Sequence, residues 1–279
     1  MVLLITDSFL RLQKVSLADY FLPQLSALNS AKIHDFEILW SEDLPIADAV
    51  YPIYEKIQLA PTPVTLIAHG KGGLDALECL LQNPQLHAKI EKFVLMQTPA
   101  WGTPIADFLT GHPLMRFVTK FLCRSMGCSL AAIEEMSELN RQVYMIVNKE
   151  KIRALMENVP VVTVGTSFEM PFTAENGFQR IMRRIQALVT KHAGANDGLV
   201  PLVSTRISTE PHVQLENVTH LSLVTPNMSI GAEVEDVTRN ILKPAKPEGP
   251  AEYPSKFPWA LSEENSDAKP AHPFQLEIS

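Results

Sequence analysis

Cysteine is scarce in this sequence of 279 residues, which contains only Cys79, Cys123 and Cys128. Three cysteines cannot all pair with one another. Cys123 and Cys128 also lack the further ligands that would form a metal-binding knuckle, and Cys79 falls within a predicted helix. We therefore expect free thiols, no bound metal, no other cofactor and a reducing, intracellular environment.

Long apolar runs and excess positive charge are also missing. No apolar stretch approaches the roughly 20 residues of a membrane-spanning helix. The N-terminal residues 1–7 have no basic segment ahead of their short apolar run, which is unlike a secretion signal. The formal net charge of -7 argues against a general affinity for nucleic acid or anionic membranes, although it does not exclude local patches. These features predict a soluble, cytoplasmic protein without nucleic-acid partners or a transmembrane segment.

Short apolar runs alternate with segments of helical periodicity along residues 2–96. This alternation predicts parallel strands with right-handed crossovers and helices on both faces of the sheet, within one domain over residues 1–242. The strands are predicted at 2–6, 35–40, 64–68, 93–96, 161–165 and 213–215. The helices are predicted at 17–28, 47–57, 178–189 and 234–242, and directly after the turn at residues 69–73.

Two segments depart from this alternation. Residues 105–158 are helical and rich in Leu, Met and Phe, which is typical of a cap inserted over an active site, although core helices would leave a similar pattern. Residues 243–279 contain closely spaced prolines and cannot form a packed helix or central strand. This tail is either disordered or anchored across the domain by Tyr253, Phe257 and Trp259.

The stretch from Val64 to Asp75 is the centre of the functional argument. It reads as a strand, a glycine-rich turn and a helix, which is the shape of a nucleophile elbow. In such an elbow, a serine lies at the apex of a strained turn between small neighbours. Here Ala68 and Gly72 are the small neighbours, but the apex is Gly70, which has no side chain that can attack a substrate.

Two later residues complete the order of a Ser-Asp-His hydrolase. Asp197 lies in an Asn-Asp-Gly loop, and His220 follows the last predicted strand. An aspartate in this position accepts a hydrogen bond from the imidazole, fixes its tautomer and stabilises the imidazolium. Alone, each residue would be read as an ordinary turn or a structural histidine. Their order behind the glycine-rich turn favours a catalytic position for both.

These motifs resemble the bacterial lipase and esterase branch of the α/β-hydrolases, related to triacylglycerol lipases. Residues 67–75, IAHGKGGLD, are similar to that group's G-H-S-x-G-G-x-D elbow. Residues 98–104, TPAWGTP, followed by Ala106 and Asp107, are similar to its T-P-x-x-G-T-P-x-A-D segment. Residues 196–201, NDGLVP, are similar to its N-D-G-x-V-P loop, and residues 219–221 to its terminal D-H or N-H pair. The resemblance covers residues 2–242 and implies an α/β-hydrolase fold that acts on an acyl ester or lipid.

The sequence departs from the family pattern at two places. Gly70 stands at the nucleophile position, and Asp7-Ser8 replaces the His-Gly that opens the oxyanion loop. The backbone N–H groups of Phe9 and Lys71 are the candidate oxyanion donors, since a backbone donor survives a change of side chain.

Three hypotheses follow from these departures. The chain is a lipase-like protein with lost or severely impaired serine hydrolysis, a non-catalytic protein that binds a lipid or a protein partner in the former acyl pocket, or an active hydrolase with a relocated nucleophile such as Ser8. The sequence does not identify a protein partner.

Overall fold

A six-stranded parallel sheet forms the centre of the structure, a computed structural model that describes residues 1–7, 19–41, 43–126, 128–169, 177–208, 210–226 and 231–243. The strands lie in the order β2-β1-β3-β4-β5-β6, and every neighbouring pair is parallel. This confirms the predicted α/β sheet. The strands are β1 (Val2–Ile5), β2 (Phe36–Leu39), β3 (Val64–His69), β4 (Ile90–Met96), β5 (Val161–Ser167) and β6 (His212–Glu216).

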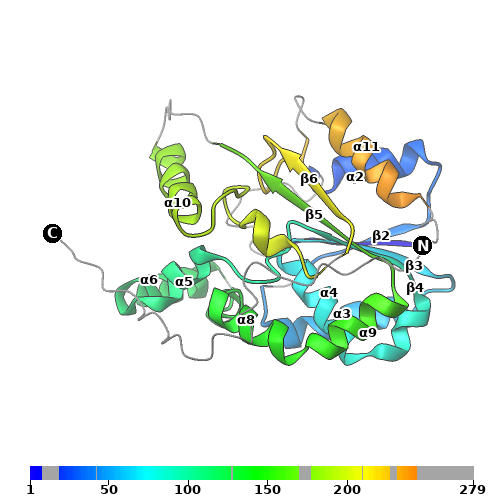
Figure 1. The fold of residues 1–279 in the computed structure, drawn as a ribbon, viewed down its shortest axis with the longest axis horizontal. Helices are drawn as coiled ribbons and strands as arrows, with labels where there is room; N and C mark the ends of the chain where they lie inside the picture. The colour runs from blue at the N-terminus through cyan, green and yellow to red at the C-terminus, as the bar shows by residue number, and fades with distance from the viewer. Residues whose placement is uncertain are drawn as a thin grey trace, which may run out of the picture. The chain divides into compact units, whose positions relative to one another are not determined.

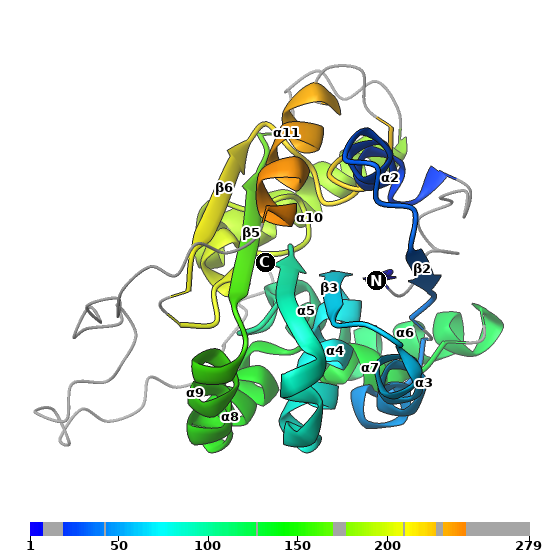
Figure 2. The same cartoon turned by 90° about the vertical axis from the view of Figure 1, so that its right-hand side faces the viewer.

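Helices cover both faces of this sheet (Figure 1 and Figure 2). On one face, α2 (Leu22–Ser30) packs against α11 (Gly231–Leu242). The other face is covered by α3 (Ile46–Leu59), α4 (Lys71–Gln82) and α9 (Lys149–Asn158). A 3-10 helix, η2 (Pro84–Lys89), connects α4 to β4, and another, η3 (Leu202–Thr205), precedes β6.

Alternate residues of the inner strands supply the two halves of the core. Leu3 and Ile5 of β1 pack in the cluster that contains α3 and α4, whereas Val2 and Leu4 pack in the cluster that contains α2 and α11. All four residues of β1 are buried, because helices cover both faces of a parallel sheet. The continuous apolar runs in the sequence reflect this double coverage.

The chain reverses its direction of travel across the sheet after β1. It crosses to β2 on one side of β1 and then returns to β3 on the other side. In an open parallel sheet, ligands bind outside the carboxyl ends of the strands at such a switch point. Asp7 follows β1 and Gly70 follows β3, so both residues lie at this point.

The predicted helical segment between β4 and β5 divides into two parts. The helices α5 (Pro104–Gly111), α6 (Pro113–Met126) and α7 (Leu130–Glu134) share a small apolar cluster, and α10 (Gly177–Ala193) lies beside α5. By contrast, Met145 of α8 (Glu138–Val147) and Leu155 of α9 join the main core. The later part of the segment therefore forms a flank of the sheet, and the earlier part is the candidate cap.

One helix begins later than the sequence predicted. The predicted helix at 17–28 starts at Leu22, because Phe21 adopts a left-handed φ of 63° and Pro23, whose fixed φ suits a first helical turn, follows it. Ser8, Phe9 and the tail from residue 244 onward lie outside the described residues. Among the described helices, none combines the length and the apolar character that crossing a membrane requires.

Candidate active site at the carboxyl edge of the sheet

Gly70 forms the sharp turn between β3 and α4 that the sequence predicted. Its φ of 55° and ψ of -129° lie outside the regions that residues with a Cβ readily adopt. At Gly72, in the first turn of α4, close packing rather than backbone conformation requires a glycine. A Cβ at residue 72 would lie 2.1 Å from the carbonyl oxygen of Thr6, so only glycine lets α4 approach β1 this closely. The glycines therefore bring the start of α4 against the end of β1.

Asp197 and His220, predicted as partners, are in direct contact. Asp197 Oδ2 lies 2.8 Å from His220 Nδ1, and both side chains are buried. Asp197 Oδ1 accepts hydrogen bonds from the backbone N–H groups of Leu199 and Val200, at 2.9 and 2.8 Å. The backbone N–H of His220 donates to the Asp197 carbonyl at 3.0 Å. The aspartate is thus held by its own loop, and it in turn orients the imidazole.

Asp7 is a third member of this group, which the sequence patterns do not predict. Its Oδ1 accepts a hydrogen bond from the backbone N–H of Lys71 at 2.7 Å, and its Oδ2 lies 3.2 Å from His220 Nε2. One feature of the sequence points to Asp7: an acidic residue follows one central strand, and the turn after the adjacent strand has a glycine at its apex. Periodicity gives no direction for a side chain in a loop, so the sequence alone does not bring Asp7 to His220.

The charged form of His220 is stabilised from both sides. Burial disfavours the imidazolium, but the charge of Asp197 and the hydrogen bonds to Asp197 and Asp7 outweigh burial and raise the His220 pKa from 6.5 to about 10. For Asp7, burial opposes ionisation, yet the hydrogen bond and charge of His220 lower its pKa overall. Both groups are therefore charged near neutral pH.

His69 lies beside His220 but remains neutral. The two rings have centroids 4.5 Å apart. Burial, followed by the charge of His220, lowers the His69 pKa to about 4. Its Nε2–H donates to Gln97 Oε1 at 2.8 Å and to the His220 carbonyl at 3.1 Å, whereas its Nδ1 accepts the Tyr20 hydroxyl proton at 2.6 Å. This assignment places a proton on Nε2 because both of its partners are acceptors.

Lys71 contributes its backbone, and not its ammonium, to the site. Its Nζ lies 2.7 Å from Asp75 Oδ1 one helical turn later, and both side chains are fully buried. Ser41 donates a hydrogen bond to the other Asp75 oxygen at 2.7 Å. Burial raises the Asp75 pKa to about 6, although the charge of Lys71 opposes this rise. The Lys71 ammonium is thus engaged by Asp75 within α4.

The segment at residues 98–107 supports the Asp197 loop. The Thr103 hydroxyl donates to the Leu199 carbonyl at 2.6 Å, and it accepts a hydrogen bond from the Ile105 N–H at the start of α5. Ser204 Oγ donates to the Gly102 carbonyl at 2.6 Å. Two of the motifs found in the sequence are therefore joined directly in space.

The same histidines and Asp7 have the composition of a metal site, but the geometry does not fit one. Ligand atoms of Asp7, His69 and His220 lie within 4.8 Å of one another. Both ring nitrogens of His69 already have hydrogen-bond partners, and both of His220 face carboxylates. A metal would have to displace one of these partners at each imidazole.

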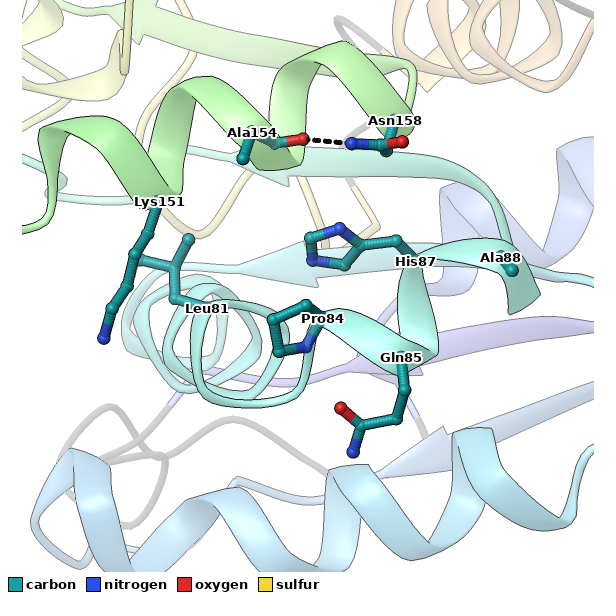
Figure 3. A pocket seen from close by; sticks show the side chains of 8 residues that line it. All are labelled: Leu81, Pro84, Gln85, His87, Ala88, Lys151, Ala154 and Asn158. Atoms are coloured by element: carbon teal, nitrogen blue, oxygen red, sulfur yellow. Dashed lines mark hydrogen bonds between the residues drawn. The ribbon is translucent and has the colours of Figure 1, made fainter.

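A hollow of about 440 Å³ lies at the other end of α4, between that helix, η2 and α9 (Figure 3). Pro84, Gln85 and His87 line it from η2, and Lys151 and Asn158 line it from α9. Because α4 begins at the carboxyl edge of the sheet and η2 leads into the start of β4, this hollow is remote from His220. It is not part of the candidate active site.

Comparison with solved structures identifies the fold of this chain. The chain has the α/β-hydrolase fold, a parallel sheet flanked by helices, and lipases and esterases are among the structures it resembles. No family model and no curated protein matches the sequence.

Three solved structures illustrate the likeness. A metagenomic carboxyl esterase is 19% identical with a TM-score of 0.64, over 86% of this chain and 75% of that one. The mature form of a Bacillus licheniformis lipase is 14% identical with a TM-score of 0.58, over 83% and 89%. Lipase 1 from Pelosinus fermentans is 10% identical with a TM-score of 0.56, over 87% and 98%. At these identities the likeness establishes the fold alone.

Proposed function

We propose that this chain is a lipase- or esterase-like hydrolase whose carboxylic ester hydrolysis is lost or severely impaired, because Gly70 takes the position of the serine. The observation that carries the proposal is the place of His220. A Cβ at residue 70 would lie 2.9 Å from Asp7 Oδ2, which itself lies 3.2 Å from His220 Nε2. A serine at this turn would therefore stand beside an imidazole already oriented by Asp197, in the geometry of a triad.

The chemistry explains the expected loss of activity. In a triad hydrolase of a different fold, removal of the nucleophile lowers kcat by about 10⁶, and binding with the oxyanion donors supplies what remains. The backbone N–H of Lys71 is the described candidate donor, and Phe9, the other candidate, lies outside the described residues. Activation of water by His220 would require the imidazole to give up its contact with Asp7.

The test restores a nucleophile and accounts for Asp7. A fluorophosphonate probe and p-nitrophenyl butyrate hydrolysis should be applied to the unmodified chain, Gly70→Ser and the pair Asp7→Gly/Gly70→Ser. We expect labelling only in the pair, because a Cβ at residue 70 would lie 2.4 Å from the Asp7 carboxyl carbon. Adding His220→Gln to the pair is the matched control and should abolish labelling.

Two outcomes would contradict the proposal. Labelling of the unmodified chain at Ser8 would favour the relocated nucleophile. A folded Asp7→Gly/Gly70→Ser variant that neither reacts with the fluorophosphonate probe nor hydrolyses the ester would show that Gly70 is not at a nucleophile position.

A second function, binding of an anionic lipid surface without catalysis, is favoured by α6. Its apolar residues Leu114, Phe117 and Phe121 are 64%, 71% and 68% exposed. The same helix carries Arg116, Lys120 and Arg124 and no acidic residue, although Arg116 also pairs with Glu134. Exposed aromatic and aliphatic residues on a basic amphipathic helix are typical of helices that lie on membranes.

Vesicle sedimentation tests this second function. The unmodified chain should bind phosphatidylglycerol vesicles and should bind phosphatidylcholine vesicles only weakly. The variant Phe117→Ser/Phe121→Ser should lose binding to phosphatidylglycerol vesicles. The matched control is Tyr51→Ser/Leu59→Ser on α3, where the side chains are 67% and 73% exposed and binding should persist. Equal loss in both variants, or no binding by the unmodified chain, would exclude a specific role for α6.

A further inference from the structure

The carboxylate of Asp7 fills the space beside the Gly70 turn. A Cβ built on Gly70 would lie 2.4 Å from both Cγ and Oδ1 of Asp7, far inside van der Waals contact. A side chain at residue 70 and this position of Asp7 are therefore mutually exclusive. The glycine is required for Asp7 to lie where it does, independently of the positive φ.

The partners of Asp7 are those that would recognise a bound carboxylate. One oxygen accepts the Lys71 N–H at the start of α4, where the helix dipole also favours negative charge. The other oxygen lies 3.2 Å from His220 Nε2. The backbone N–H of Asp7 donates to Tyr20, so the strand end that carries the carboxylate is itself fixed.

The number of protons on His220 and its two carboxylate partners decides whether the contact between Asp7 and His220 is attractive. A neutral imidazole carries one N–H, yet both nitrogens of His220 face carboxylate oxygens, Asp197 Oδ2 at 2.8 Å and Asp7 Oδ2 at 3.2 Å. A second proton must therefore lie between Nε2 and the Asp7 oxygen. The group holds two protons and one net negative charge, and Nε2 cannot act as a base while Asp7 is in place.

We propose that Asp7 is a built-in carboxylate ligand of this site, and that the site it occupies binds a free small carboxylate once the Asp7 side chain is removed. Among the described residues, the Lys71 N–H and the His220 imidazolium hold the anion. This inference concerns binding and does not depend on ester hydrolysis. In the unmodified chain the site is closed by its own side chain.

The test measures acetate binding to the unmodified chain and to Asp7→Gly. Melting temperature is recorded in sodium acetate against sodium chloride of equal ionic strength. At acetate tenfold above the Kd, the melting temperature of Asp7→Gly should rise by about 2–5 °C, and that of the unmodified chain should not change. Asp7→Asn keeps the shape of the side chain and is the matched control, which should not respond to acetate.

Nuclear magnetic resonance of the His220 ring gives a second readout. The groups that face this ring are Asp7, Asp197 and the neutral His69. Both ring nitrogens should be protonated at neutral pH in the unmodified chain, only Nδ1 in Asp7→Gly, and both again when acetate is added to that variant. Asp7→Gly/His220→Gln should lose acetate binding.

Two results would overturn the proposal. The first is a folded Asp7→Gly variant that binds no acetate, which would mean that Asp7 only fills space and does not occupy a carboxylate-binding site. The second is acetate binding of equal strength by the unmodified chain, which would place the carboxylate elsewhere. If Asp7→Gly does not fold, Asp7→Ala is tested against the same expectations. If neither folds, the proposal is decided on the unmodified chain, and a ring with a single protonated nitrogen at neutral pH would refute it.

Discussion

Two buried ionic groups lie within one turn of the start of α4, and they are assembled differently. Lys71 and Asp75 are four residues apart on one helix, so their pairing forms whenever the helix forms. Asp7 and His220 are separated by 213 residues and meet, with Asp197, only in the complete fold. A local pair can serve stability alone. The convergence of three loops at a switch point of the sheet is the arrangement expected of a binding or catalytic site.

The largest effect that separates the two groups should come from Lys71→Met. Removing the lysine leaves the Asp75 carboxylate buried without its cation, which typically costs about 3–5 kcal/mol of unfolding free energy. Urea denaturation measures this cost. Lys71→Met/Asp75→Leu should recover most of it, because an apolar pair of similar volume needs no charge partner. If the double variant is as unstable as the single one, the pair does more than stabilise the helix.

Gly70→Ala should lower the unfolding free energy by at least about 1–3 kcal/mol, the usual cost of forcing a residue with a Cβ into a strained conformation. The clash with Asp7 adds to this cost. In an Asp7→Gly background the same substitution should cost less, and the difference between the two backgrounds, measured by urea denaturation, isolates the clash. Equal costs in both backgrounds would mean that Asp7 moves aside freely.

The Asp7-His220-Asp197 group should make stability depend on pH. The folded pKa of His220 is raised from 6.5 to about 10, so its contribution is fully present below pH 6.5 and is lost as the pH rises toward 10. One proton limits the slope to about 1.4 kcal/mol per pH unit. The unfolding free energy of the unmodified chain should fall across this window relative to His220→Gln. Parallel curves for the two proteins would contradict the charged assignment.

The smallest effect should come from an exposed pair of the same local type as Lys71 and Asp75. Arg239 and Asp236 on α11 are three residues apart, and their side chains are 44% and 68% exposed. Asp236→Asn should therefore change the unfolding free energy by less than about 1 kcal/mol, and salt should reduce even that. A larger change in urea denaturation would show that burial is not what distinguishes the two pairs.

The sequence predicted the parts of the fold that depend on local pattern. The double-sided burial of β1 and β3 appears as continuous apolar runs, and the turn at Gly70 appears as a cluster of glycines between a strand and a helix. The pairing of Asp197 with His220 followed from chain order. The helical pattern does not mark the start of α2 at Leu22, because that start depends on the left-handed Phe21.

The sequence does not predict the part of the candidate site that depends on the direction of side chains in loops. In the sequence, Asp7 is only a departure from a motif, whereas in the structure it contacts His220 and the start of α4. Tyr20 and Gln97, which fix the His69 tautomer, were missed for the same reason. The orientation of side chains in loops is set by partners that are distant in sequence, and single-sequence patterns carry little of that information.

The competition between Asp7 and any side chain at residue 70 imposes an order on mutational change. A serine that arises first at residue 70 meets the carboxylate at 2.4 Å and yields a strained protein, whereas shortening residue 7 first leaves room for the later change. A serine at residue 70 is therefore reached at a lower steric cost when residue 7 is already short. The Asp7 side chain thus limits which residues position 70 tolerates, in addition to the limit set by the backbone conformation.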